Sequence, residues 1–242
     1  MEVNAYAIEH EVEKNHWWFV GRRYLFGNII KKLKFDRNAA IVDIGSSSGT
    51  NLRLLKDLGF SNYHGLDISE EAKKFCAEKQ LGNVHIVDIQ NTDLSKNSYD
   101  FILATDVLEH LADDCSAVSR IYSGLKSGGY LLVTVPCFKC LWGQQDIVAQ
   151  HLRRYYKSEV EDILKKNNFG IIKSFYFNFL LFIPILIARK ILLQQNKIKN
   201  ENEINNAIIN SILKLVFIFD CWISSVLNPP FGVSALILAK KP

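Results

Sequence analysis

The sequence lacks several features that would point to particular classes of protein. No basic segment followed by an apolar run stands near Met1, so we expect no secretory signal and a cytoplasmic protein. A net charge of only +4 over 242 residues does not indicate nucleic-acid binding. No internal repeat or low-complexity tract appears, which excludes repeat arrays. What remains is a globular chain whose 48% hydrophobic residues suffice for a full core.

Cysteine is scarce, and its spacing fits neither disulfides nor a metal site. The five cysteines are an odd number, and we expect them to be reduced. Cys137 and Cys140 form one Cys-x-x-Cys pair, but no second pair or suitably spaced histidines follow it, as structural zinc requires. A thioredoxin-type pair opens a helix, whereas this pair follows an expected strand. The sequence therefore predicts no metal site.

Long uncharged apolar runs are also missing. The run of residues 174–188 is shorter than the about 18 residues that a membrane span needs, and it contains Pro184. The uncharged stretch 221–239 is broken by proline and glycine at positions 229–232. The sequence therefore predicts no transmembrane helix.

The chain is organised around residues 39–50, Ala-Ala-Ile-Val-Asp-Ile-Gly-Ser-Ser-Ser-Gly-Thr. The first half is a short apolar run without a helical period, which predicts a buried strand. Gly45 and Gly49 bracket three serines, and glycine allows both a sharp turn and close approach of a ligand. Residues 51–58 then place leucines on one helical face. This order aims the free N–H groups of a helix N-terminus at whatever binds on the turn.

Two ligands are compatible with such a turn. A dinucleotide site requires glycine at the first, third and sixth positions, which are Gly45, Ser47 and Thr50 here, so a nicotinamide oxidoreductase is disfavoured. Asp43, Gly45, Ser47 and Gly49 instead resemble the acid-x-Gly-x-Gly-x-Gly signature of class I S-adenosylmethionine-dependent methyltransferases, with serine at the middle glycine. A tight strand-to-helix turn also needs glycine for structural reasons alone.

Polar residues end the strands that follow. Asp67 ends the expected strand 63–68, about 20 positions after the first glycine, where an acid accepts ribose hydroxyls. Asp88 ends the strand 83–89; the resemblance implies that it contacts adenine, although a strand-end turn also favours aspartate. Thr105 ends the fourth strand. Ligands of parallel sheets bind beyond the carboxyl ends of the strands, so these side chains should converge.

Two further blocks resemble the same family, Asp-Val-Leu-Glu-His at 106–110 and Leu-Lys-Ser-Gly-Gly at 125–129. The resemblance implies an α/β fold, a Rossmann-like three-layer sandwich with a seven-stranded, mostly parallel sheet whose last strand, within 231–242, is antiparallel. It implies S-adenosyl-L-methionine as the cofactor. The residues expected to bind it are Asp43, Gly45, Ser46, Ser47, Gly49, Asp67, Ile68, Asp88, Ile89, Thr105 and Val107.

Two aromatic and basic segments resemble a subgroup of these enzymes whose acceptors are largely unknown. One is the His-Trp-Trp-Phe run that starts at His16, and the other is His-Leu-Arg-Arg-Tyr at 151–155. Residues 1–35 are expected either to form a helical lid whose arginines face an anionic substrate or to be pinned to the core by their aromatics. The candidate substrate-binding residues are Trp18, Arg22, Arg23, Trp142, Asp146, Arg153, Arg154 and Tyr155.

The expected reaction moves a methyl group to an oxygen or nitrogen of a small-molecule, glycan or lipid-linked acceptor. Alignment of the reactants can supply about 7–11 kcal/mol of the barrier in well-oriented cases. A hydroxyl acceptor also needs a general base, for which His151 is the first candidate and His110 the second. His151 could instead fix its loop to Asp146. Because Ser47 replaces a glycine, a cofactor-binding protein without activity is the alternative.

The whole chain, 1–242, is expected to be one methyltransferase domain. After the lid come a cofactor-binding core, 36–178, and an apolar helical insertion, 179–230, before the last strand. Cations beside apolar helices suit an anionic lipid surface, and a helical cap on the sheet or a homodimer interface fits the insertion as well. The cations near the apolar segments or the chain end are Arg189, Lys190, Lys197, Lys199, Lys240 and Lys241.

Overall fold

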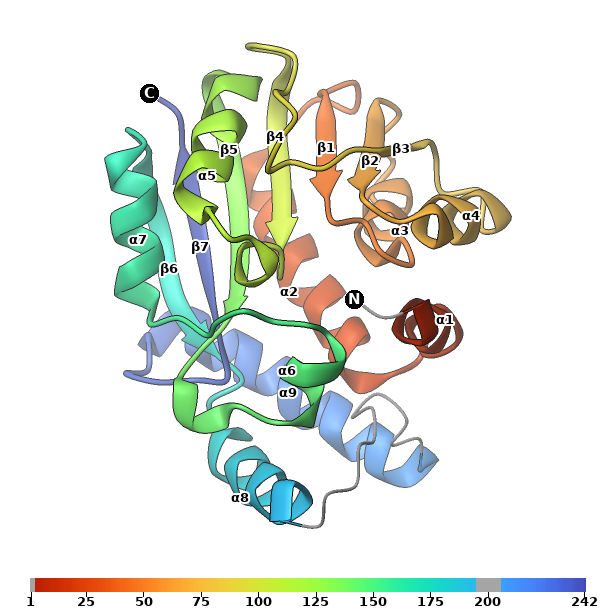
Figure 1. Cartoon of the computed structure of the whole chain (residues 1–242), viewed down its shortest axis with the longest axis vertical. Coiled ribbons are helices and arrows are strands. Elements are labelled where there is room, and N and C mark those ends of the chain that lie inside the picture. Colours follow the sequence, from red (N-terminus) through yellow and green to blue (C-terminus); the bar gives the residue numbers. More distant parts are fainter. Residues whose placement is uncertain (1–2, 195–205) are drawn as a thin grey trace.

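The computed structural model describes residues 3–194 and 206–242 and contains a seven-stranded sheet (Figure 1). The strand order is β3-β2-β1-β4-β5-β7-β6, and every neighbouring pair is parallel except those that β7 makes with β5 and β6. The predicted fold class is confirmed, including the antiparallel final strand. The strands are β1 (Ile41–Ile44), β2 (Tyr63–Asp67), β3 (Val84–Ile86), β4 (Tyr99–Thr105), β5 (Leu125–Pro136), β6 (Gly170–Phe177) and β7 (Ser234–Lys240).

Helices cover both faces of the sheet, which is why its central strands are apolar on both sides. One layer contains α2 (Trp17–Leu33), α3 (Thr50–Asp57) and α9 (Ala207–Leu227), and the other contains α5 (Asp114–Gly124) and α7 (Lys157–Lys166). Helix α4 (Glu70–Glu78) packs beside β3 at the sheet edge. Beyond the carboxyl ends of the strands lie α1 (Val3–Val12), the short turn η1 (Leu108–His110), α6 (Gln144–Val148) and α8 (Phe182–Gln194) (Figure 1).

Helix α9 of the insertion belongs to the helical layer on the sheet. Phe217 is fully buried against α2, and a Cβ atom on Gly21 would lie 2.0 Å from the Phe217 ring, so only glycine lets the helices approach this closely. Asp220 accepts hydrogen bonds from the backbone N–H groups of Asn178 (2.5 Å) and Leu180 (2.8 Å). These contacts fix α9 to the end of β6.

The expectation that no segment could cross a membrane is wrong by length and hydropathy. Helix α9 has 21 residues with a mean hydropathy of 1.7 in its most apolar window, although it carries Lys214 and Asp220. These two charges divide its apolar sequence, so the helix contains no long uncharged run. Such helices also occur in the cores of soluble proteins, but only 22% of this window is buried. Much of its apolar surface therefore faces outward.

Few of the cations expected beside the insertion are seen there as exposed charges within the described residues. Arg189 is buried and donates to the carbonyl oxygen of Leu141 at 2.6 Å. Lys240 and Lys241 are at the C-terminus, at the opposite end of the sheet from α8 (Figure 1). Lys197 and Lys199 lie outside the described residues. Of the six, Lys190 alone is seen as an exposed cation of the insertion within the described part of the chain.

Candidate active site

A cavity of about 250 Å³ lies where β1, β2, β3 and β4 end. At the glycine turn the backbone lies close to Val107. Gly45 has a φ of 73°, and a Cβ there would lie 2.7 Å from Cγ2 of Val107. A bulkier turn would fill the space that a ligand needs. Seven of the residues predicted for the cofactor line this cavity: Gly45, Ser47, Asp67, Ile68, Asp88, Ile89 and Val107.

Asp67 is held at the cavity wall by three hydrogen bonds. Its Oδ2 accepts from the backbone N–H of Ser47 at 2.8 Å, and its Oδ1 accepts from the backbone N–H of Ser69 at 3.0 Å and the hydroxyl of Tyr6 at 3.2 Å. These bonds fix a carboxylate where a cofactor's ribose hydroxyls are accepted in folds of this kind. The cavity therefore fits S-adenosylmethionine at both the turn and the acid.

The other four predicted cofactor residues support the cavity and do not line it. Asp43 is fully buried, and burial raises the pKa of its carboxyl to about 7. The side-chain amide of Asn51 donates to Asp43 and to the hydroxyl of Thr105, each at 2.9 Å. Ser46 donates its hydroxyl to the carbonyl of Asp43, and Gly49 caps helix α3 with a φ of 89°. Together they hold the turn in shape.

Helix α1 closes over the cofactor cavity, and sequence reasoning identified none of its contacts. Tyr6 lines the cavity beside Asp67, and Glu9 accepts a hydrogen bond of 2.5 Å from the hydroxyl of Ser47. Burial raises the pKa of Glu9 to about 7. No motif marks these positions in the sequence, and only the fold brings them to the glycine turn.

A second cavity, of about 360 Å³, adjoins the first, and Asp106 and His110 line both. Its walls are largely apolar and come from α2, the end of β5, and both helices of the insertion. The insertion contributes Leu181, Pro184, Ile185, Ala188, Arg189 and Leu213. An acceptor in this cavity would meet the cofactor at the shared wall.

Three of the predicted substrate-binding residues, Trp18, Arg22 and Arg154, line this second cavity. The guanidinium of Arg22 pairs with Asp106 at 2.5 Å and lies 5.4 Å from the centre of the Trp18 ring. Arg154 donates from Nε to Asp146 at 2.8 Å and from Nη1 to the carbonyl of Cys137 at 2.9 Å. Both arginines therefore already have acceptors within the protein.

The remaining five, Arg23, Trp142, Asp146, Arg153 and Tyr155, lie outside the wall of this cavity. Arg23 donates to the carbonyl oxygens of Glu13 and Lys14 and so fixes the connection between α1 and α2. Arg153 pairs with Asp114 at 3.2 Å, and the hydroxyl of Tyr155 donates to the same carboxylate at 2.7 Å. Arg153 and Tyr155 thereby secure the loop that carries His151.

His151 lines the second cavity and is oriented by Asp146. Its Nδ1 lies 2.8 Å from Oδ1 of Asp146, which is fully buried. Burial alone would raise the pKa of Asp146, but hydrogen bonds from His151 and Arg154 and the charge of Arg154 outweigh it and lower that pKa to about 2. His151 thus has one nitrogen paired with a carboxylate of α6 and the other on the side of Glu109.

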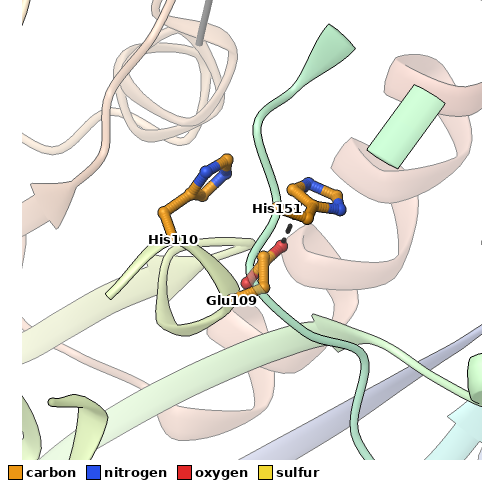
Figure 2. Close-up of side chains that lie close together, drawn as sticks. All are labelled: Glu109, His110 and His151. Carbon is orange, nitrogen blue, oxygen red and sulfur yellow. Dashed lines mark ion pairs between the residues drawn. The ribbon is translucent and has the colours of Figure 1, made fainter. Parts of the chain in front are cut away.

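His110 completes the wall shared by the two cavities. Its ring centroid lies 4.8 Å from that of His151, and Glu109 lies next to it on the same turn, facing the segment that carries His151 (Figure 2). Burial, with a smaller effect of the neighbouring His151, lowers the pKa of His110 to about 4. The imidazole of His110 is therefore neutral at pH 7. Both histidines predicted for catalysis line the second cavity, which we call the acceptor cavity from here on.

Comparison with known families identifies the family of the chain. The family model described as "Methyltransferase domain" matches residues 19–174, more than half of the chain. The chain belongs to this methyltransferase family. The enzyme uses S-adenosylmethionine, and the cavity at the glycine turn is where Ser47, Asp67 and Asp88 would hold it.

The methyltransferase has relatives that act on small acceptors and neighbours with the same fold. It is 27% identical to phosphoethanolamine N-methyltransferase of Plasmodium falciparum over 157 residues, which are 60% of this chain and 59% of that protein. A chain of the complex between the Haloferax volcanii Trm112 methyltransferase activator and a methyltransferase has a TM-score of 0.65 at 17% identity, covering 100% of this chain and 96% of that one.

Haemonchus contortus phosphoethanolamine N-methyltransferase 2, solved with S-adenosyl-L-methionine, has a TM-score of 0.60 at 20% identity, covering 89% of this chain and 51% of that one. The chain thus spans about half to three fifths of the length of these phosphoethanolamine methyltransferases. The structural likenesses show the fold, and the acceptor has to be argued from the second cavity.

Replacement of Asp67 by alanine should weaken S-adenosylmethionine binding at least about tenfold, because charge-assisted hydrogen bonds contribute roughly 1.5–3 kcal/mol each and 1.4 kcal/mol is a factor of ten in affinity. Titration calorimetry on the purified protein measures this. Asp93→Ala, which removes an exposed aspartate outside both cavities, is the matched control. Unchanged affinity in a folded Asp67→Ala protein would remove Asp67 from the site.

Proposed function

We propose that this methyltransferase methylates an oxygen or nitrogen of an acceptor with a large apolar part, such as a lipid-linked glycan. The observation that supports this is the wall of the acceptor cavity. Trp17, Trp18 and Phe19 of α2 line it together with apolar residues of α8 and with Leu213 of α9. Burial of apolar acceptor surface there contributes about 25 cal/mol for each Å² removed from water.

The reaction needs little chemistry from the protein itself. S-adenosylmethionine supplies a methyl carbon made electrophilic by the sulfonium that carries it. The protein aligns the acceptor atom with that carbon at the wall shared by the two cavities, where Asp106 and His110 lie, and helix α1 excludes water on the cofactor side. His151, oriented by Asp146, is placed to take the proton of a hydroxyl acceptor.

A small charged acceptor such as phosphoethanolamine, on which the relatives act, is the second candidate. Its phosphate would need cationic partners in the acceptor cavity. Arg22 pairs with Asp106, Arg154 with Asp146, and Arg189 donates to the carbonyl of Leu141. Because each of these cations already serves a partner in the fold, the cavity favours an apolar acceptor.

The insertion also supports peripheral attachment to the inner face of a membrane. On α9, large apolar side chains three or four residues apart are more than half exposed and share one helical face. Ile183 and Ile187 of α8, each 54% exposed, add a second such face beside the acceptor cavity. Alternatively, a second copy of the chain buries these apolar faces in a homodimer interface. The exposed face of α9 consists of Ile208, Ile212, Leu215, Phe219, Trp222 and Val226.

Labelled S-adenosylmethionine, incubated with the enzyme and with cell extract divided into lipid and water-soluble fractions, tests the proposed acceptor. Label should enter the lipid fraction, and mass spectrometry would identify the product. Label in a water-soluble amine would instead support a small charged acceptor such as phosphoethanolamine. Tight cofactor binding with no labelled product from either fraction would favour a cofactor-binding protein without activity.

A further inference from the structure

Glu109 presents a buried carboxylate that lacks hydrogen bonds. Its side chain is fully buried, and neither oxygen has a hydrogen-bond partner within the described part of the chain. The Nε2 atom of His151 lies 3.9 Å from Oε1 of Glu109, beyond hydrogen-bond distance. Ionised carboxylates in protein interiors are normally paired or coordinated to metal ions, because burying one alone is costly.

Three potential ligands surround one space beside Glu109. Ligand atoms of Glu109, His110 and His151 all lie within 4.8 Å of one another (Figure 2). Glu109 and His110 are adjacent in η1, and the loop that carries His151 is attached to the same turn, because the N–H of Leu152 donates to the carbonyl of Glu109 at 2.8 Å. The backbone therefore holds the two segments together independently of the three side chains.

The hydrogen bond to Asp146 determines the tautomer of His151, and with it the state of the nitrogen nearest to Glu109. A carboxylate accepts, so Nδ1 carries the hydrogen in its 2.8 Å contact with Asp146. In neutral imidazole Nε2 then has a lone pair, and it points toward the oxygen of Glu109. If the carboxyl of Glu109 is ionised, a cation between these two acceptors would satisfy both of them. Histidine ligands of metals typically donate their other N–H to a carboxylate in this way.

We propose that Glu109, His110 and His151 bind one divalent transition-metal ion whose open coordination positions face the acceptor cavity. Two imidazoles and one carboxylate suit Zn²⁺, Mn²⁺ or Fe²⁺. Two ligand atoms about 2.1 Å from a shared ion are at most about 4.2 Å apart, so small side-chain rotations close the site. All three residues line the acceptor cavity, and His110 also lines the cofactor cavity. The sequence predicted no metal because His151 is distant from the Glu-His pair along the chain.

The ion would hold the acceptor's oxygen beside the cofactor and lower the pKa of a hydroxyl there. The hydroxyl proton then passes to water, and the oxygen bonds to the methyl carbon as the carbon–sulfur bond breaks, leaving S-adenosylhomocysteine. This use rests on the proposed function, whereas binding of the ion does not. An ion at this place favours an oxygen acceptor over an amine.

Calorimetric titration of protein without a histidine tag, stripped with EDTA, tests the site in the absence of cofactor and acceptor. Zn²⁺ and Mn²⁺ are the probes, and one equivalent should bind per chain. Glu109→Gln and His151→Gln should each weaken binding at least about tenfold. His85→Gln, which removes an exposed histidine of β3 outside both cavities, should leave it unchanged.

Thermal melting separates loss of the site from loss of the fold. The ion should raise the melting temperature of the wild type and not that of Glu109→Gln. Failure of the wild type to bind either ion stoichiometrically, or equal affinity in Glu109→Gln, would overturn the inference and leave Glu109 as a protonated acid. Methyl transfer that survives chelation would overturn the catalytic use of the ion but not its binding, and would leave the proposed function intact with His151 as the base.

Discussion

His151→Ala is expected to lower kcat at least about a hundredfold while S-adenosylmethionine affinity stays nearly unchanged. The side chain lines the acceptor cavity and not the cofactor cavity, so its loss should affect turnover only. As the base, His151 would contribute typically ~10²–10⁴-fold. As a ligand of the proposed ion it would take no proton, but its loss would remove the ion and with it turnover. The effect is measured by the initial rate of methyl transfer from labelled S-adenosylmethionine, at saturating cofactor, into the extract fraction that takes up label with the wild type.

The control for this variant is His85→Ala, because His85 is exposed and outside both cavities. Asp146→Asn keeps the shape of the partner side chain and should reduce kcat less than loss of the imidazole does. If Asp146→Asn and His151→Ala lose equal activity and both melt at lower temperature, His151 serves to fix its loop to Asp146 and has no chemical role.

The protein is expected to float with lipid vesicles, and Phe219→Ser combined with Trp222→Ser is expected to abolish flotation. Both side chains are more than half exposed, on the outer face of α9. Burying one large apolar side chain contributes about 1.5–3 kcal/mol, so loss of both side chains should lower partitioning by roughly 10²–10⁴-fold. Because Arg189 points inward and the C-terminal lysines lie at the far end, salt should weaken binding only slightly.

Ile172→Ser is the matched control for the flotation experiment, since Ile172 is 55% exposed and belongs to β6 and not to α8 or α9. Neutral and anionic vesicles at low and high salt distinguish apolar insertion from charge attraction. A protein that stays in the soluble fraction under all these conditions and sediments as a dimer would assign the exposed face of α9 to a second copy of the chain.

The cofactor half of the molecule is predictable from sequence because local rules determine it. Residues 39–50 combine an apolar run with two glycines, and a leucine-rich segment follows them. These features predict a strand, a tight turn and a helix in that order. Parallel pairing then brings Asp67 and Asp88 to one edge without further information. These residues reach the cavity because they belong to regular alternating strands and helices.

The rest of the site, which includes the contacts of helix α1 with the glycine turn, is less predictable because long-range packing determines it. Tyr6 and Glu9 lie on a helix with little amphipathic pattern, and only docking of α1 places them at the glycine turn. Arg23 and Arg153 stand in suggestive aromatic and basic motifs, yet they brace backbone elements. The outward face of α9 was obscured because Lys214 and Asp220 interrupt its apolar sequence. None of these outcomes depends on neighbours along the chain.

The direction of β7 has a consequence for how such enzymes diversify. Since β7 runs against both β5 and β6, the connection between β6 and β7 starts and ends at the edge where Pro136 and Phe177 meet Ser234. Any segment inserted there arrives beside the acceptor without disturbing the glycine turn or its acids. Evolution can therefore lengthen, shorten or recompose this one connection to recruit new acceptors while the methyl donor's machinery stays under separate selection.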